Sequence, residues 1–218
     1  VNQQFRRDIF IKGARAMTAV EKRDSIMATA IRPLRPRAQM SFQFVTPQGE
    51  ASGQDSVYSP IADRVAAGSV TVAQIAEETR IDVRKLLQAV AALTSNGSIH
   101  PAVDGLDPSA CHRLNGAVAK KMLNGHPYRY LAAPGIGNGI NATEIDLMAV
   151  DALMRGIPAE AEDVSEEVWQ FFKKTGGRLL KDGEPIEGGT ANRAELANRV
   201  ETILTQHLPI WRELGVLA

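Results

Sequence analysis

The sequence of 218 residues contains one cysteine, Cys111, and therefore cannot form an intramolecular disulfide framework. It has no apolar run of about 18 residues, the length that a membrane-spanning helix needs. Its first residues include neither an initiator Met nor the apolar stretch of a secretory signal. These absences predict a soluble protein of the reducing cytoplasm, and they favour a fragment of a longer chain.

The chain also lacks an excess of either charge, since 25 basic residues balance 25 acidic ones, so nothing draws it generally to nucleic acid or to anionic lipid. The charge is uneven, however, because residues 1–37 carry nine basic side chains against three acidic ones. Such asymmetry fits docking between parts of one assembly, and equally a solvated basic face. The candidate interaction residues here are Arg6, Arg7 and Arg15, because Arg6 and Arg7 flank a short strand predicted over residues 5–11.

The local patterns predict an α+β fold that is mainly helical, with small β elements, in three parts. Residues 1–55 form a basic strand–helix–strand segment, residues 56–103 a winged-helix subdomain, and residues 104–218 a mainly helical C-terminal subdomain. In the first part, Thr18 and Glu21 have the spacing of a capping box, which predicts a helix over residues 19–30. Alternating apolar residues predict a half-buried strand over residues 39–44.

Further helices and turns follow from capping and turn residues. Ser59 and Pro60 predict the start of the first helix of the middle part. Residues 104–127 are expected to be irregular because they contain several Gly and Pro breaks. Asn141, with Glu144 three residues on, predicts a helix start. A helix ending at Gly176 and a hairpin at Gly183 come next, before the terminal helices.

The segment from Thr71 to Ala102 outlines a helix, a tight turn, a second helix and a short hairpin, which is typical of a winged helix-turn-helix. Asp82 is placed to cap the second helix, whose outward residues begin with Arg84 and Lys85 and continue mainly with alanine. Reading DNA bases needs Arg, Lys, Asn or Gln along the exposed face, and phosphate contacts need several cations. DNA binding is therefore the less favoured alternative, and Arg84 and Lys85 are kept as candidate interaction residues.

The glycines from Gly135 to Gly139 imitate a nucleotide or S-adenosylmethionine loop, since they follow a predicted strand and precede a predicted helix. No acidic residue stands just before the first glycine, and no repeated strand–helix alternation follows. A flexible connection is the favoured interpretation. The histidines and Cys111 lack the spacing of a zinc site, and the neighbours Cys111 and His112 need not face each other. The sequence therefore offers no catalytic, cofactor-binding or metal-binding residue.

Four stretches, in order, are "QFRRDIFIKGARAM", "SVYSPIADRVAAGSVTVAQIA", "YRYLAAPGIGNGINATEIDLMAVDAL" and "LPIWRELGVL". Together they resemble the regulatory region that follows the catalytic domain in a group of bacterial class I methyltransferases, which includes rickettsial protein-lysine methyltransferases. The resemblance covers roughly residues 4–217. In that family the S-adenosylmethionine-binding domain lies upstream, so no catalytic residue can be carried over to this chain.

The resemblance implies a non-catalytic region that packs against the catalytic domain of the same chain and helps to select or gate a protein substrate. S-adenosylmethionine would bind upstream, with no cofactor in this region. Two alternatives stay open: a winged-helix DNA-binding regulator, and an independent small-molecule enzyme that uses the Gly135–Gly139 loop. The sequence leaves the methyl acceptor and the oligomeric state open, a homodimer included.

Overall fold

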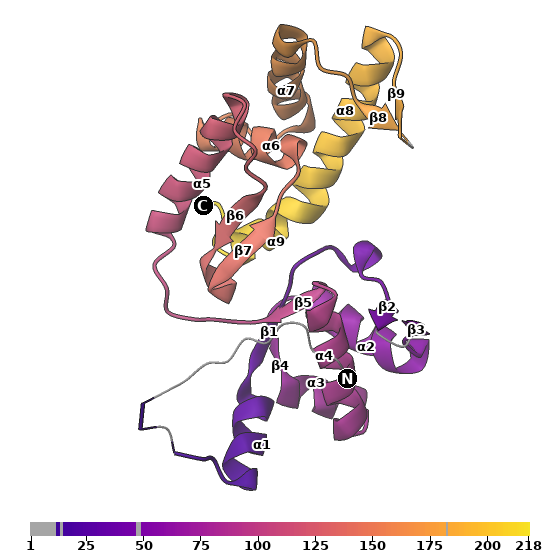
Figure 1. Cartoon of the computed structure of the whole chain (residues 1–218), viewed down its shortest axis with the longest axis vertical. Helices are drawn as coiled ribbons and strands as arrows, with labels where there is room; N and C mark the ends of the chain where they lie inside the picture. The colour runs from indigo at the N-terminus through magenta and orange to yellow at the C-terminus, as the bar shows by residue number, and fades with distance from the viewer. Residues whose placement is uncertain (1–11, 14, 47–48, 182) are drawn as a thin grey trace.

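The computed structural model describes residues 12–13, 15–46, 49–181 and 183–218, which form two lobes stacked along the long axis of the molecule (Figure 1). The fold is α+β and mainly helical, with small antiparallel sheets, as the sequence predicts. Residues 19–101 form the N-terminal lobe and residues 109–217 the C-terminal lobe. Each lobe has its own cluster of buried apolar side chains.

The N-terminal lobe surrounds a three-stranded antiparallel sheet with helices. In chain order its elements are α1 (Ala19–Ala28), β1 (Ala30–Pro33), the 3-10 turn η1 (Arg37–Gln39), β2 (Gln43–Thr46), β3 (Gly49–Ser52), α2 (Asp55–Ala66), β4 (Val70–Thr71), α3 (Val72–Thr79), α4 (Val83–Ser95) and β5 (Ile99–Pro101). Strand β1 is central, because Ile31 pairs with Val70 of β4 on one side and with Pro101 of β5 on the other. Ile31 and Met40 are buried in the same cluster as the side chains of α2, α3 and α4.

Side-chain caps explain where these helices begin. Thr18 and Glu21 form the predicted capping box of α1, and the Asp82 carboxylate accepts hydrogen bonds from the first N–H groups of α4, also as predicted. Arg80, at the end of α3, adopts a left-handed backbone with φ of 53° and so makes the tight turn between α3 and α4.

Three predictions for this lobe need correction. The strand expected over residues 39–44 starts too early, because Gln39 ends the turn η1 and β2 begins at Gln43. The short hairpin expected after α4 does not form, because β5 pairs with β1 from far upstream and not with a strand that follows it. Helix α2 begins at Asp55, and Pro60 lies inside it. The additional first turn of α2 is stabilised by packing of Tyr58, because the centroid of its ring lies 5.5 Å from that of Phe42 and 5.4 Å from that of Phe44.

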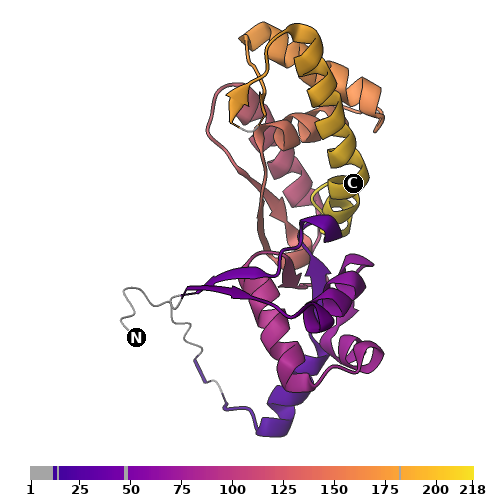
Figure 2. The ribbon, with the colours of Figure 1, turned by 90° about the vertical axis from the view of Figure 1, so that its right-hand side faces the viewer.

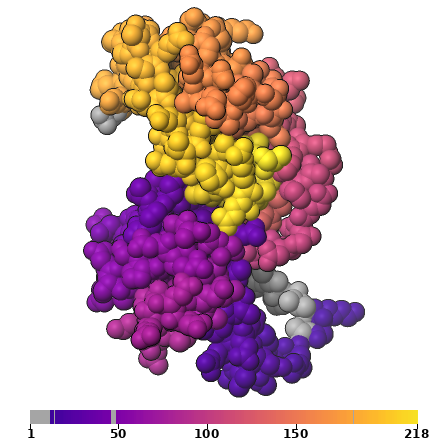
Figure 3. All heavy atoms as spheres, turned by 180° about the vertical axis from the view of Figure 1, so that it is seen from behind, coloured from indigo at the N-terminus to yellow at the C-terminus, as the bar shows by residue number. Residues whose placement is uncertain are grey.

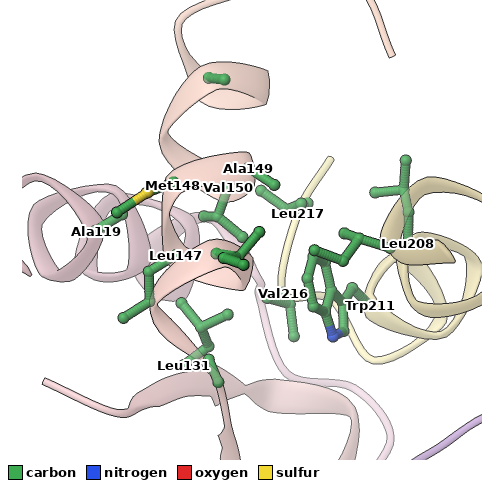
Figure 4. Packing of buried hydrophobic residues seen from close by; sticks show 14 of the residues in the cluster. Ala119, Leu131, Leu147, Met148, Ala149, Val150, Leu208, Trp211, Val216 and Leu217 are labelled. Atoms are coloured by element: carbon green, nitrogen blue, oxygen red, sulfur yellow. The ribbon is translucent and has the colours of Figure 1, made fainter. Parts of the chain in front are cut away.

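The C-terminal lobe contains two hairpins, β6–β7 and β8–β9, held among helices. In chain order its elements are α5 (Ser109–Leu123), β6 (Tyr130–Ala133), the 3-10 turn η2 (Pro134–Ile136), β7 (Asn138–Asn141), α6 (Glu144–Met154), α7 (Ala161–Thr175), β8 (Leu180–Lys181), β9 (Glu184–Pro185), α8 (Gly189–Thr202), the π-helical segment η3 (Ile203–His207) and α9 (Leu208–Glu213). Among the described helices α6 is the most buried, and its Leu147 belongs to the same apolar cluster as Leu131, Trp211 and Val216 (Figure 4). The predicted helix ending at Gly176 and the predicted hairpin at Gly183 are confirmed.

Two expectations for this lobe need correction. The stretch expected to be irregular contains the 15-residue helix α5, whose start is stabilised by hydrogen bonds from the Ser109 hydroxyl and N–H to Asp107. Both bonds lower the pKa of the Asp107 carboxyl below its usual value, and the bond from the Ser109 hydroxyl has the larger effect. Helix α6 is capped by Thr143 with Asp146, not by Asn141, because Asn141 is the last residue of strand β7.

The two lobes meet at a seam formed by β1, η2 and α9. Arg32 of β1 donates hydrogen bonds to the carbonyl oxygens of Gly135 (3.2 Å) and Glu213 (3.3 Å). The backbone N–H of Ser69 donates to the Glu213 carboxylate at 3.0 Å. Figure 2 shows the two lobes from the side, and Figure 3 shows the C-terminal helices lying directly on the N-terminal lobe. Backbone and side-chain bonds together therefore fix this contact.

Candidate functional site

A groove of about 730 Å³ opens on the C-terminal lobe beside the start of α6. A second cavity of about 350 Å³ adjoins it at the seam. The two share a wall of Gln39, Asn141, Thr143, Asp146 and His207. We call the combined space the seam groove, because Gln39 belongs to the N-terminal lobe and the other four residues belong to the C-terminal lobe.

The centre of the seam groove holds a histidine between an acid and an amide. The Asp146 carboxyl is buried and accepts hydrogen bonds from the Thr143 N–H (2.7 Å) and hydroxyl (2.8 Å), which complete the capping box of α6. His207 Nδ1 lies 3.7 Å from Asp146 Oδ1, and Gln39 Nε2 lies 3.1 Å from His207 Nε2. With Gln39 Nε2 as the donor, His207 Nε2 is the acceptor, and the proton of a neutral imidazole then lies on Nδ1, the nitrogen nearer to the carboxylate.

This arrangement suits binding better than covalent catalysis. The hydroxyls of Thr143 and Thr202, which both line the groove, already donate to Asp146 and to the backbone oxygen of Asn198. Neither hydroxyl is therefore directed at His207 as a nucleophile. The groove instead offers polar walls over an apolar floor, to which Ile145, Phe172, Leu179 and Ile203 contribute.

Arginines form the rim of the seam groove. Three of them form ion pairs with glutamates: Arg129 with Glu144 (2.8 Å), Arg178 with Glu187 (3.2 Å) and Arg199 with Glu195 (2.8 Å). Arg35 differs, because its Nε donates to the backbone oxygen of Gly97 at 3.0 Å and, within the described part of the chain, it has no acidic partner. Arg35 is therefore the rim cation best able to receive a carboxylate from a ligand.

Of the predicted interaction residues, the three that the structure describes, Arg15, Arg84 and Lys85, do not line this groove. Arg6 and Arg7, with the predicted strand over residues 5–11, fall outside the described residues. Arg15 is exposed and donates to Glu21 at 2.6 Å. Arg84 and Lys85 are exposed on the first turn of α4, and neither forms an ion pair with any residue that the structure describes.

Gly135 and Gly137 lie in the connection of the β6–β7 hairpin, whereas Gly139 is part of β7, and Gly135 lies in the seam. The Gly135 N–H donates to the carbonyl oxygen of Leu214 at 2.9 Å, and its own carbonyl oxygen accepts from Arg32 and from the Val103 N–H. A Cβ atom at Gly135 would lie 2.3 Å from Arg32 Nη1 and 3.0 Å from Leu214 Cα. The expectation of a flexible connection is wrong at Gly135, where glycine permits close packing of two lobes.

Cys111 and His112 do not form a reactive pair. Cys111 faces a cavity next to the β6–β7 hairpin, whereas His112 faces a different cavity bordered by α6 and α9. Across the described residues, no three His, Cys, Asp or Glu side chains gather closely enough to hold a metal ion. No described helix is long and apolar enough to cross a membrane.

Sequence analysis missed two buried asparagines that support the hairpins. Asn115 of α5 donates to the carbonyl oxygens of Ala132 (2.9 Å) and Val216 (3.0 Å), and it accepts from the Ala132 N–H at 2.7 Å. Asn192 of α8 similarly accepts from the Leu179 N–H and donates to two carbonyl oxygens beside the β8–β9 hairpin. A polar residue within the apolar stripe of a helix is the signal that could have identified both.

The chain is similar to an uncharacterized protein of Synechocystis sp., with 27% identity over 223 residues. The match covers 99% of this chain but 43% of that protein, so the chain spans less than half the length of its relative. No protein-family model matches the chain. No solved structure matches it either.

Proposed function

We propose that this chain is the non-catalytic regulatory and substrate-recognition region of an S-adenosylmethionine-dependent protein methyltransferase. In this proposal it docks on a catalytic domain upstream in the same polypeptide, and that domain binds S-adenosylmethionine. The proposal extends the sequence resemblance described above. The observation that carries it is the exposed surface of α1.

Helix α1 does not contribute a buried side chain to the core of its lobe. It lies at the end of the molecule farthest from the C-terminal lobe (Figure 1). Met17, just before it, and Val20, in its first turn, are 53% and 67% exposed. These two exposed apolar side chains, one just before the helix and one on it, support the proposal when taken with the apolar cavity beside α1.

The surroundings of α1 have the composition of a protein interface. A small cavity of about 250 Å³ between α1 and α4 is lined by apolar side chains and by Lys22 and Arg23. Arg84 and Lys85 extend the basic rim on the first turn of α4. An apolar centre with a charged rim is the usual anatomy of a docking surface, and the basic rim favours an acidic partner face. We call this region the α1 surface.

The Synechocystis relative supports attachment to a further domain, because more than half of that protein lies outside the region matched by this chain. A domain joined covalently has a high effective concentration, so even a modest interface can hold it in place. The small size of the α1 surface is therefore compatible with docking within one polypeptide.

The first test is the coding sequence immediately upstream of Val1. A class I methyltransferase domain with an acid followed by a glycine loop supports the proposal, whereas a start codon at Val1 contradicts it. The second test is calorimetric titration of this chain with the upstream domain, expressed separately. Replacing Met17 and Val20 by Asp should weaken binding, while replacing Lys173 and Lys174 by Glu, on exposed positions at the far end of α7, should leave it unchanged.

DNA binding is the alternative outcome, and it has its own assay. At about physiological salt we expect affinity for duplex DNA no tighter than the micromolar range of non-specific binding. Nanomolar affinity with a steep salt dependence, lost on Arg84→Glu and Lys85→Glu, would instead identify a DNA-binding regulator. Titration of the chain with S-adenosylmethionine should give no binding, since the proposal places that cofactor in the upstream domain.

A further inference from the structure

The β6–β7 hairpin is a two-stranded sheet, and each of its strands has an outer edge. In an antiparallel pair, successive residues alternate between bonding to the partner strand and pointing away from it. The Ala142 N–H donates to the Arg129 oxygen at 2.8 Å, so those two residues face each other. Their neighbours Tyr130 and Asn141, which are register partners, must therefore direct their backbone groups outward.

The outer edge of β6 is closed by a side chain. Ala132 points outward, and Asn115 bonds to both its N–H and its carbonyl oxygen, as a neighbouring strand would. Helix α5, which carries Asn115, runs along this side of the hairpin (Figure 1). An added strand cannot reach Ala132 because the buried amide of Asn115 already occupies its hydrogen-bonding groups.

The outer edge of β7 is open by contrast. Gly139 is the register partner of Ala132 and points outward on the opposite side, as Asn141 does. The Gly139 N–H is bonded to the Asn138 side chain at 2.8 Å. The Gly139 carbonyl oxygen and both backbone groups of Asn141 have no hydrogen-bond partner among the residues described, and both residues are exposed. Native proteins usually cover or blunt such an edge.

This open edge borders the seam groove. Gly139, Ile140 and Asn141 line the smaller of its two cavities. The same cavity is lined by Leu34 and Ile210, which are partly buried, and by Arg35, whose guanidinium has no acidic partner among the described residues. A segment added to β7 would therefore find backbone hydrogen-bond partners along the strand. Its side chains would find apolar contacts at Leu34 and Ile210, and one cation without an acidic partner at Arg35.

We propose that the outer edge of β7 binds an extended, acidic segment of another protein as a third strand of the hairpin, with a carboxylate of that segment on Arg35. Resting on the proposed function, we assign the segment to the methyl-acceptor protein. Strand addition supplies affinity through main-chain hydrogen bonds and leaves specificity to the side-chain pockets. An acidic segment is favoured because Arg35 has no acidic partner in the described structure, whereas the other rim arginines are paired.

Nucleic acid fits this groove less well. Binding a phosphate backbone requires several available cations, and three of the four rim arginines are already engaged with glutamates. An extended peptide with a single carboxylate needs only one available cation, and Arg35 supplies it.

The experiment is a selection of peptides from a random twelve-residue library displayed on phage, with the 218-residue chain as the target. Selected peptides are then measured by fluorescence anisotropy against Arg35→Gln and against three variants of the hairpin. Asn141→Pro removes one outward N–H of β7, and proline is tolerated on an edge strand. Asn141→Ala loses the same side chain but keeps the N–H. Tyr130→Pro makes the same backbone change on β6, so it is the control for the other edge.

We expect acidic binders whose affinity falls about tenfold on Asn141→Pro and stays within about twofold on Asn141→Ala and Tyr130→Pro. Arg35→Gln should weaken them about fivefold, and replacing the peptide carboxylate by its amide should remove that difference. Methylating alternate backbone nitrogens of the peptide tests strand addition without changing the protein. Melting temperatures establish that each variant is folded.

Recovery of no binder tighter than about 100 μM would overturn the proposal, as would binders equally sensitive to Tyr130→Pro or insensitive to Asn141→Pro. The selection requires no methyltransferase domain and no S-adenosylmethionine. If peptide binding at β7 is found while the α1 surface fails to bind a catalytic domain, the strand-addition site stands and the proposed function falls. If the α1 surface binds a catalytic domain while no peptide binds at β7, the docking proposal is retained and the strand-addition site is rejected.

Discussion

Replacing Asn115 by leucine should be among the most destabilising single changes in the C-terminal lobe. The side chain is fully buried and makes three hydrogen bonds, two to Ala132 and one to Val216. Leucine has a similar size and a better helix propensity, and the better propensity contributes about 0.5 kcal/mol to the stability of the variant. It leaves three backbone groups without partners, however, at a cost of about 1–3 kcal/mol each. The net loss of about 2.5–8.5 kcal/mol is a large part of the stability of an ordinary domain.

The assay is urea denaturation followed by far-ultraviolet circular dichroism, with Asn198→Leu as the control. Asn198 is an exposed asparagine in the middle of α8, and its replacement should change the free energy of unfolding by no more than about 0.5 kcal/mol. A loss below about 1 kcal/mol for Asn115→Leu would refute the reasoning, since it would mean that the three backbone groups find other partners.

Asn115→Asp gives a second, pH-dependent test of the same contacts. The introduced carboxyl keeps the acceptor for the Ala132 N–H but faces the oxygens of Ala132 and Val216, so burial and these oxygens should raise its pKa in the folded protein. Below the pKa that this carboxyl has in the unfolded chain, it is protonated in both states and carries no electrostatic penalty. As the pH rises from that value towards the higher pKa of the folded protein, the penalty on folding grows. The variant should therefore lose stability relative to the native chain between about pH 4 and pH 7, whereas Asn115→Leu should show no such trend.

Two further predictions concern the seam and the first helix. Gly135→Ala places a Cβ atom 3.0 Å from Leu214 Cα, so it should lower the free energy of unfolding, measured in urea, by about 1–3 kcal/mol. Gly139→Ala is the control and should be nearly neutral, because its Cβ atom meets only ordinary van der Waals contacts. Equal losses for the two variants would show that the seam is not tightly packed. The pKa of the Glu21 carboxyl is lowered in the folded protein, chiefly by the hydrogen bond from the backbone N–H of Thr18. The capping contact therefore stabilises α1 at any pH above the pKa that Glu21 has in the unfolded chain. This stabilisation is lost as the pH falls through the lower pKa that Glu21 has in the folded protein. Carboxyl titration by NMR should find Glu21 more acidic than other exposed glutamates, and a value equal to theirs would contradict the capping-box account.

Local chemistry accounts for what the sequence could predict. The caps of α1 and α4 depend on residues within one turn of the helix start, so Thr18 and Asp82 identify them directly. The same kind of signal misplaced the start of α6 by two residues. Asn141 and Thr143 both offer a capping side chain, and the pairing of β7 with β6 decides between them.

The seam groove could not be predicted in this way, because its residues come from distant segments. Gln39, Asp146 and His207 belong to a 3-10 turn, a helix start and a π-helical segment. Strand β1 was missed for a similar reason: it has four residues and gains its partners from β4 and β5, which lie far along the chain. A pattern within one short window does not contain those pairings.

The α1 surface and the β7 edge lie in different lobes, and the seam joins them through a short series of bonded parts. Helix α1 leads through Thr29 into β1, and Arg32 of β1 donates to Gly135, which stands between β6 and β7. The Arg32 side chain is only 17% exposed, and Gly135 has no room for even a methyl group. A shift of α1 on docking therefore cannot be absorbed at the seam without breaking packed contacts. If docking and peptide binding both occur, this path gives a physical reason for each to affect the other, and the effect would be reciprocal.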